Sequence, residues 1–244
     1  MTEMDQDDVV ARRYLTGEYL AHNPSWDSED SAWKAGLVIK ALRMQGIQPT
    51  SLADVGCGAG LVLAELRRSL VDTRLVGFEI APDARRFWDK HAGAGIEFHL
   101  GDFFSLADRH YDVLLVLDVV EHLRDPHDFL VKIRGYADHF VFHFPLDLSA
   151  LNVLREAPLL NVRSKVGHIH YFTRRLALSL LEESGFEAAG WFYTGATFSA
   201  PQRTWKTRFA ALFRRMAYAL SKDFGVRLLG GETLIVVASP ANQT

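Results

Sequence analysis

Short apolar runs alternate with longer stretches of helical periodicity along most of the chain. Runs that suit buried strands occupy residues 52–55, 73–79, 96–100, 111–118, 139–145, 186–193 and 232–239. Stretches typical of helices lie at 9–19, 31–44, 83–91, 126–136, 149–155, 174–184 and 204–221. Strands that alternate with helices predict an α/β domain with a largely parallel sheet.

The turn after the first strand holds three glycines at alternate positions, Gly56, Gly58 and Gly60. Glycine permits a positive φ and lets a ligand approach the main chain closely, and the helix that follows offers free N–H groups. A dinucleotide fingerprint would need glycine where Leu61 stands, and no Gly-Lys-Ser/Thr of a P-loop follows. The turn therefore predicts a nucleotide-type site of another kind on an α/β sheet.

Composition narrows the class of protein. A length of 244 residues and 48% apolar content fit one α/β domain with additions. The net charge of −3 gives no general attraction to nucleic acid, and the single cysteine, Cys57, allows no internal disulfide. No apolar signal region opens the chain and no run approaches the ~20 apolar residues of a membrane span. We therefore expect a cytoplasmic protein.

Four signals occur in the order found in class I S-adenosylmethionine-dependent methyltransferases. The glycine loop after Asp54 resembles that family's first motif, and Glu79 ends the second strand, where a carboxylate offers two acceptor oxygens to a ribose. Asp102 follows the third strand, and Asp118-x-x-Glu-His follows the fourth, as in the small-molecule branch. Residues 167–173 resemble a stretch of quinone- and sugar-modifying methyltransferases. The resemblance implies a Rossmann-like, seven-stranded, mostly parallel sheet with an antiparallel last strand and helices on both faces.

The resemblance also implies that the cofactor is S-adenosyl-L-methionine. In this family the glycine loop packs on the amino-acid end of the cofactor, the acid after the second strand binds the ribose, and the Asp after the third strand accepts from the adenine amine. The cofactor-binding residues carried over on this basis are Asp54, Gly56, Cys57, Gly58, Gly60, Glu79, Ile80, Asp102, Phe103, Asp118 and Val119.

Three histidines follow strands or border the last helix and are candidate catalytic residues: His122, His143 and His168. A histidine suits a general base near neutral pH, although His122 and His168 also suit a purely structural role. His168 and His170 lie two apart and point the same way on an extended segment, but no companion Cys/His cluster is visible. We therefore expect no metal site.

We interpret residues 1–244 as a single methyltransferase domain in three parts. Residues 1–48 form a helical leader, whose aromatics Tyr14, Tyr19, Trp26 and Trp33 either cover the site or pack on the sheet. Residues 49–194 and 232–240 form the core. Residues 195–231 form a helical insertion, and within it 203–222 is basic and amphipathic. That stretch favours packing on the domain or in a homodimer, with peripheral membrane or lipid contact as the alternative.

The sequence predicts methyl transfer to a small-molecule acceptor, with O-methylation of a sugar, phenol or quinone-type compound as the leading interpretation. One alternative is a non-catalytic subunit that binds S-adenosylmethionine for a partner. Another is a nicotinamide-dependent oxidoreductase, which the glycine spacing disfavours. Action on nucleic acid is not expected, because the charge is slightly negative and no Asn/Asp-Pro-Pro-aromatic signature follows the fourth strand.

Overall fold

The computed structural model describes residues 9–23, 26, 28–91, 93–196, 217–218 and 221–241. Apart from 217–218 and 221, the helix expected over 204–221 lies outside the described residues. The same holds for most of the 203–222 stretch that we considered for membrane, lipid or dimer contact. Among the described residues no helix is both long and apolar enough to cross a bilayer.

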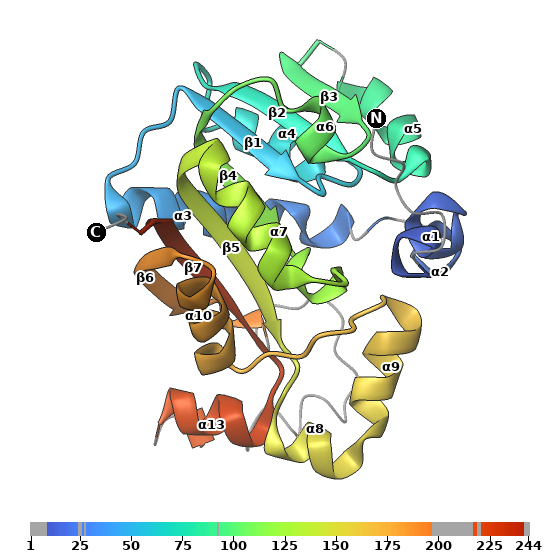
Figure 1. Ribbon diagram of the computed structural model, residues 1–244, viewed down its shortest axis with the longest axis vertical. Coiled ribbons are helices and arrows are strands. Elements are labelled where there is room, and N and C mark those ends of the chain that lie inside the picture. The colour runs from blue at the N-terminus through green and yellow to red at the C-terminus, as the bar shows by residue number, and fades with distance from the viewer. Residues whose placement is uncertain are drawn as a thin grey trace.

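Seven strands form one sheet in the order β3-β2-β1-β4-β5-β7-β6 (Figure 1). Their bounds are β1 Ser51–Val55, β2 Arg74–Glu79, β3 Ile96–Leu100, β4 Tyr111–Leu117, β5 Ala137–Leu146, β6 Phe186–Tyr193 and β7 Glu232–Pro240. Strands β1 to β5 pair in parallel, whereas β7 is antiparallel to both β5 and β6. The predicted fold class is confirmed, and the strand order changes direction between β1 and β4, where open α/β sheets bind ligands.

Helices cover both faces of this sheet (Figure 1). They are α1 Val9–Leu15, α2 Glu18–His22, α3 Ser31–Gln45, α4 Leu61–Arg67, α5 Arg85–Trp88, α6 Phe103–Leu106, α7 Pro126–Ile133, α8 Ala150–Arg155, α9 Ala157–Lys165, α10 Arg174–Glu183 and α13 Lys222–Leu229. Strand β4 illustrates why both faces are covered, because its apolar side chains point to both. Val113 and Leu115 join the core under α3 and α4, while Leu114 and Val116 join the core under α7 and α10. A strand buried on both faces reads as a continuous apolar run.

Local structure departs from the sequence expectation in three places. The helix expected over 83–91 is a short α5 between two 3₁₀ turns, Pro82–Ala84 and Asp89–His91. The insertion after β5 carries α9 as well as the expected α8, and α13 was not expected as a separate helix. Such short helices depend on tertiary packing, because isolated helices of this length are marginal in water.

The N-terminal helices reach across to the insertion after β5. Arg13 Nη1 and Nη2 donate to the backbone carbonyls of Arg163 and Ser164, at 3.2 and 2.9 Å. These carbonyls belong to the last turn of α9, where a cation also complements the helix dipole. The contact joins two segments 150 residues apart on the right side of Figure 1.

A pair of leucine truncations tests the central position of β4. Leu114 is fully buried, whereas Leu154 in α8 is 85% exposed. Leu114→Ala is expected to lower the free energy of unfolding by about 2–5 kcal/mol, because it removes buried methyl groups and leaves a cavity. Leu154→Ala is expected to change it by less than about 0.5 kcal/mol. Urea denaturation followed by circular dichroism measures both, and equal midpoints would contradict the assigned core.

Candidate functional site

The glycine loop is held between β1 and β2 by backbone hydrogen bonds. Gly56 N and Cys57 N both donate to the carbonyl of Phe78, at 2.8 and 3.0 Å. Gly56, Gly58 and Gly60 have φ of 75°, 53° and 76°, a region that other residues rarely adopt. A Cβ at Gly58 would stand 2.5 Å from the Trp26 ring. The loop therefore needs glycine for its turn and for the close approach of neighbouring groups.

A cavity of about 360 Å³ opens beside this loop, at the carboxyl ends of β1, β4 and β5. Eight of the predicted site residues line it: Asp54, Gly56, Cys57, Gly58, Asp118, His122, His143 and His168. The cavity also contains Lys34 and Thr233, which the sequence did not single out. The structure thus brings together residues from the first glycine motif, the fourth and fifth strands and the stretch before α10.

A buried carboxyl group, that of Asp54, lines the cavity next to the glycine loop. Asp54 is 2% exposed, and its Oδ1 makes no hydrogen bond. Burial and the nearby carboxylate of Glu79 raise the pKa of Asp54 to about 8, although the Lys34 ammonium opposes this rise. A carboxyl group in this state favours a ligand that carries positive charge.

Asp118 turns the chain at the end of β4, and its carboxylate contacts Lys34 and His143. Its φ of 54° lies in the left-handed region, which Asp tolerates better than most residues. Its Oδ2 lies 2.7 Å from Lys34 Nζ, and its Oδ1 lies 2.6 Å from His143 Nδ1. Burial by itself would raise the pKa of Asp118, but His143 and Lys34 outweigh it and lower this pKa below the ordinary value.

His143 is a brace rather than a free base. It is 2% exposed, and its Nε2 lies 2.7 Å from Thr233 Oγ1 on β7, while Nδ1 bonds to Asp118. Both ring nitrogens are therefore occupied, which favours a structural role over the candidate base that the sequence suggested. The bonds connect β4, β5 and β7 at the floor of the cavity.

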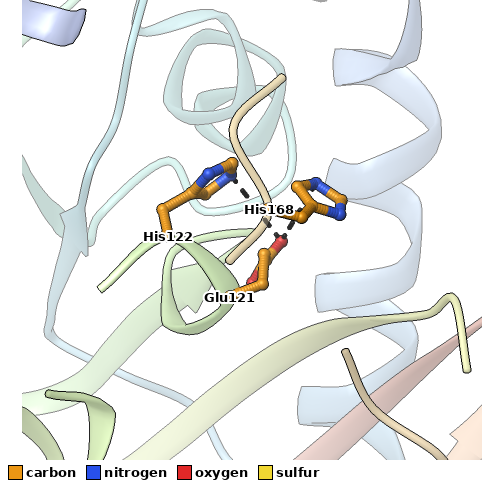
Figure 2. A group of neighbouring side chains, drawn as sticks. All are labelled: Glu121, His122 and His168. Atoms are coloured by element: carbon orange, nitrogen blue, oxygen red, sulfur yellow. Dashed lines mark ion pairs between the residues drawn. The ribbon is translucent and has the colours of Figure 1, made fainter. Parts of the chain in front are cut away.

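A second group of side chains consists of Glu121, His122 and His168 (Figure 2), and its two histidines line the cavity. Glu121 is fully buried, and neither carboxylate oxygen has a hydrogen-bond partner. Its Oε1 lies 3.9 Å from His122 Nε2 and 4.0 Å from His168 Nε2. His168 Nδ1 bonds in turn to Asp147 Oδ2 at 2.7 Å. An imidazole that donates from Nδ1 has its Nε2 lone pair free for chemistry.

Burial controls the ionisation of this group. It raises the pKa of Glu121 well above the ordinary value, with a further contribution from the Asp118 carboxylate. It also lowers the pKa of His122 to about 4, helped by the neighbouring His168 ring at 4.9 Å between centroids. The His122 imidazole is therefore neutral at physiological pH and holds a proton only weakly, but its ring nitrogens can still bind a cation.

The remaining predicted residues do not line this cavity. Glu79 is 7% exposed, and its oxygens accept from Gly58 N and Ala81 N, so it holds the glycine loop. Asp102 caps α6 by accepting from Ser105 N. Of the other four, Gly60 lies against Phe98 and Val119 lies against Gly56. Ile80 is half-buried, and the ring of Phe103 is buried against Phe78.

Aromatic residues of the N-terminal segment reach the site, which agrees with the interpretation that they cover it. Trp26 and Trp33 line the cavity, and the Trp33 ring meets His143 edge-on at 6.0 Å between centroids. Tyr14 meets His122 in the same way at 5.9 Å. The side chain of Tyr19 lies outside the described residues.

Three site residues escaped the sequence analysis, for different reasons. Asp147 comes just after the fifth strand, and the rule that selected Asp118 would have found it. Lys34 follows Trp33 in the first turn of α3, and a lone lysine there gives no signal. Thr233 reaches the site because antiparallel pairing sets it opposite Pro145, a long-range register that the sequence does not display.

The chain matches a known family over most of its length. A methyltransferase domain family matches residues 34–189, which is more than half of the chain. The ubiquinone biosynthesis O-methyltransferase of Azorhizobium caulinodans is 34% identical over 90 residues. The aligned stretch covers 35% of this chain and 35% of that enzyme, so the chain spans about a third of its length.

Solved structures agree on the fold. The magnesium protoporphyrin IX methyltransferase of Synechocystis PCC 6803, determined with bound SAH, has a TM-score of 0.55 at 16% identity and covers 86% of this chain and 83% of that one. The [4+2]-cyclase SpnF has a TM-score of 0.52 at 16% identity and covers 79% and 76%. At such identities the likeness establishes the fold alone, and the cyclase shows that a shared fold does not determine the reaction.

Motif order, sheet topology and the family match agree with one another and disagree with a nicotinamide-dependent enzyme. The chain therefore belongs to the class I S-adenosylmethionine-dependent methyltransferases.

Proposed function

We propose that the protein transfers a methyl group from S-adenosylmethionine to a hydroxyl oxygen of a small phenol- or quinone-type acceptor. The observation that carries the proposal is the buried carboxylate of Asp54 beside the glycine loop, whose Oδ1 makes no hydrogen bond. S-adenosylmethionine carries a sulfonium and an ammonium group, and a buried carboxylate is stabilised by such a cation.

The residues around the cavity fit this cofactor. Asp54, with Gly56 and Gly58, would hold its amino-acid end, because a carboxylate and an open main chain suit an ammonium and a close approach. Asp118 adds negative charge close by, partly neutralised by Lys34. We propose Glu79, Ile80, Asp102 and Phe103 as contacts of the nucleoside half, on the family resemblance.

When bound, the cofactor supplies an activated methyl group on sulfur. The acceptor oxygen forms its bond to the methyl carbon as the carbon–sulfur bond breaks, and the electron pair stays on sulfur. His168 lines the cavity, and its Nε2, which is not used in the bond to Asp147, would accept the hydroxyl proton. Alignment of oxygen and methyl in one cavity supplies much of the remaining acceleration.

The acceptor class rests on two observations. The histidine cluster offers proton acceptors, which a hydroxyl needs and a tertiary amine does not. The Azorhizobium relative is by name an O-methyltransferase of ubiquinone biosynthesis, over the third of its length that aligns. A phenolic compound with neighbouring oxygen substituents is therefore the acceptor to test first.

Replacement of one cavity histidine tests the catalytic proposal. His168→Ala is expected to lower kcat for methylation of a phenolic acceptor by about 10²–10⁴-fold, because it removes a positioned proton acceptor. The Kd for S-adenosylhomocysteine is expected to change by less than about threefold, since we assign cofactor binding to Asp54, Asp118 and the glycine loop and not to His168. Radiolabelled methyl transfer and calorimetric titration measure the two quantities.

His110→Ala is the matched control, because His110 is exposed and bonds to Asp138 outside the cavity. It should retain the wild-type kcat. Methyl transfer that proceeds normally in the His168 variant would remove that residue from the mechanism. Cofactor binding without turnover on any hydroxylated acceptor would instead favour the non-catalytic subunit.

The raised pKa of Asp54 predicts proton release on cofactor binding. At pH 6.5 an acid with a pKa of about 8 is protonated, and the bound cation favours its ionised form. Binding should therefore release about one proton per site, and affinity should rise as pH rises toward 8. Calorimetry in two buffers of different ionisation enthalpy measures the release.

Asp54→Asn should abolish this proton release. Asp112→Asn is the control and should preserve it, because Asp112 lies at the start of β4, whereas the cavity is at the end of that strand. No release from the wild-type protein would show that Asp54 does not face the cation of the cofactor.

A further inference from the structure

Three potential metal ligands converge at the edge of the cavity, on two segments far apart in the chain. A carboxylate oxygen of Glu121 and a ring nitrogen from each of His122 and His168 all lie within 4.8 Å of one another (Figure 2). Two imidazoles and one carboxylate form a common ligand set for zinc and related first-row ions. The sequence analysis considered only the pair His168 and His170 and expected no metal site, and His170 is not part of this group.

The buried carboxylate of Glu121 makes no hydrogen bond that would stabilise its negative charge. Glu121 is fully buried, and both of its oxygens lack a hydrogen bond. A buried carboxylate in this position is costly unless a proton or a cation neutralises it. The two histidine side chains that face it are 12–13% exposed, so the group is also largely shielded from water.

The surroundings hold the ligands in a binding arrangement. Asp147 Oδ2 lies 2.7 Å from His168 Nδ1, which fixes the ring so that Nε2 points to Glu121. Metal-bound histidines usually have such a carboxylate behind them. The Glu121 carbonyl also accepts from Ile169 N and His170 N at 2.9 and 3.1 Å, so the backbone beside His168 is tied to the turn that carries the other two ligands.

We propose that Glu121, His122 and His168 bind one divalent transition-metal ion, with zinc as the best-suited ion and Asp147 as a positioning residue. Bonds of about 2.1 Å in a tetrahedral site separate neighbouring ligand atoms by roughly 3.4 Å. The observed distances of 3.9 and 4.0 Å from Glu121 Oε1 to the two histidine nitrogens need a closure of only about half an ångström each. Rotation of the side chains supplies such a closure.

The fourth position of this ion would face the cavity, because His122 and His168 line it. With the ion bound, the histidine nitrogens that face Glu121 would be ligands rather than proton acceptors. An acceptor hydroxyl on the ion would then lose its proton to solvent, since a metal ion lowers the pKa of a bound oxygen. This use of the ion rests on the proposed function, whereas the ion site itself does not.

Metal binding by the full-length protein tests the site without an activity assay. Protein stripped with EDTA is titrated with Zn²⁺ against a chromophoric chelator, and Co²⁺ is added separately to record its visible absorption. We expect one Zn²⁺ per chain with a Kd in the micromolar range or tighter, and a Co²⁺ spectrum of low coordination number. Excess Mg²⁺ should not compete, because it prefers oxygen ligands.

Four variants locate the ion. Glu121→Gln and His168→Ala should weaken Zn²⁺ binding at least 100-fold, and Asp147→Asn by about 10–100-fold. His127→Ala, which removes an exposed histidine of α7, should bind as the wild type does. Asp147→Asn keeps the shape of its side chain, so it remains informative if a ligand variant fails to fold.

The outcomes separate this site from the proposed function. Absence of stoichiometric binding, or equal binding by all four variants, would overturn the site. A metal-loaded protein that methylates no hydroxylated acceptor would leave the site standing and overturn the proposed function. Methyl transfer by a stripped protein that binds no Zn²⁺ would do the reverse.

Discussion

The ion pairs of Asp118 with Lys34 and His143 are the contacts on which the site depends most. They join the first turn of α3 to the ends of β4 and β5, at distances of 2.7 and 2.6 Å. The left-handed backbone at Asp118 persists because these partners fix its carboxylate. Loss of one partner would leave a charge in the wall of the cavity without compensation, which is why breaking such a pair is more damaging than never having formed it.

These polar contacts continue from His143 to β7 and to the start of the 195–231 insertion. His143 bonds to Thr233, and Thr233 Oγ1 lies 2.6 Å from Thr194 Oγ1. Glu232, which is 2% exposed, accepts from Gly195 N at 2.8 Å. The start of the 195–231 insertion is thereby fixed to the floor of the cavity, so a change in that segment has a direct physical route to the site.

Two groups of residues at the cavity differ chemically, as the two ligands of the proposed reaction require. Next to the glycine loop is the buried acid Asp54, which suits a cation. The neutral imidazole of His122 lies beside Glu121, and this pair suits a metal ion. Asp54 Oδ1 and both carboxylate oxygens of Glu121 are buried and make no hydrogen bond. A ligand that binds such groups stabilises them, whereas without a ligand they lower the stability of the fold.

By itself the sequence determined the α/β class, the glycine turn at Gly56 to Gly60 and the acids that follow the strands, because backbone sterics and the burial of short apolar runs are local properties. Only the tertiary structure decided which side chains meet. The partnership of His168 with Glu121, rather than with His170, depends on the loop after α9 folding back onto the turn after β4. The presence of Lys34 and Thr233 in the cavity depends likewise on the docking of α3 and on the antiparallel register of β7. Such long-range contacts follow from the packing of the whole sheet, and no local pattern of residues records them.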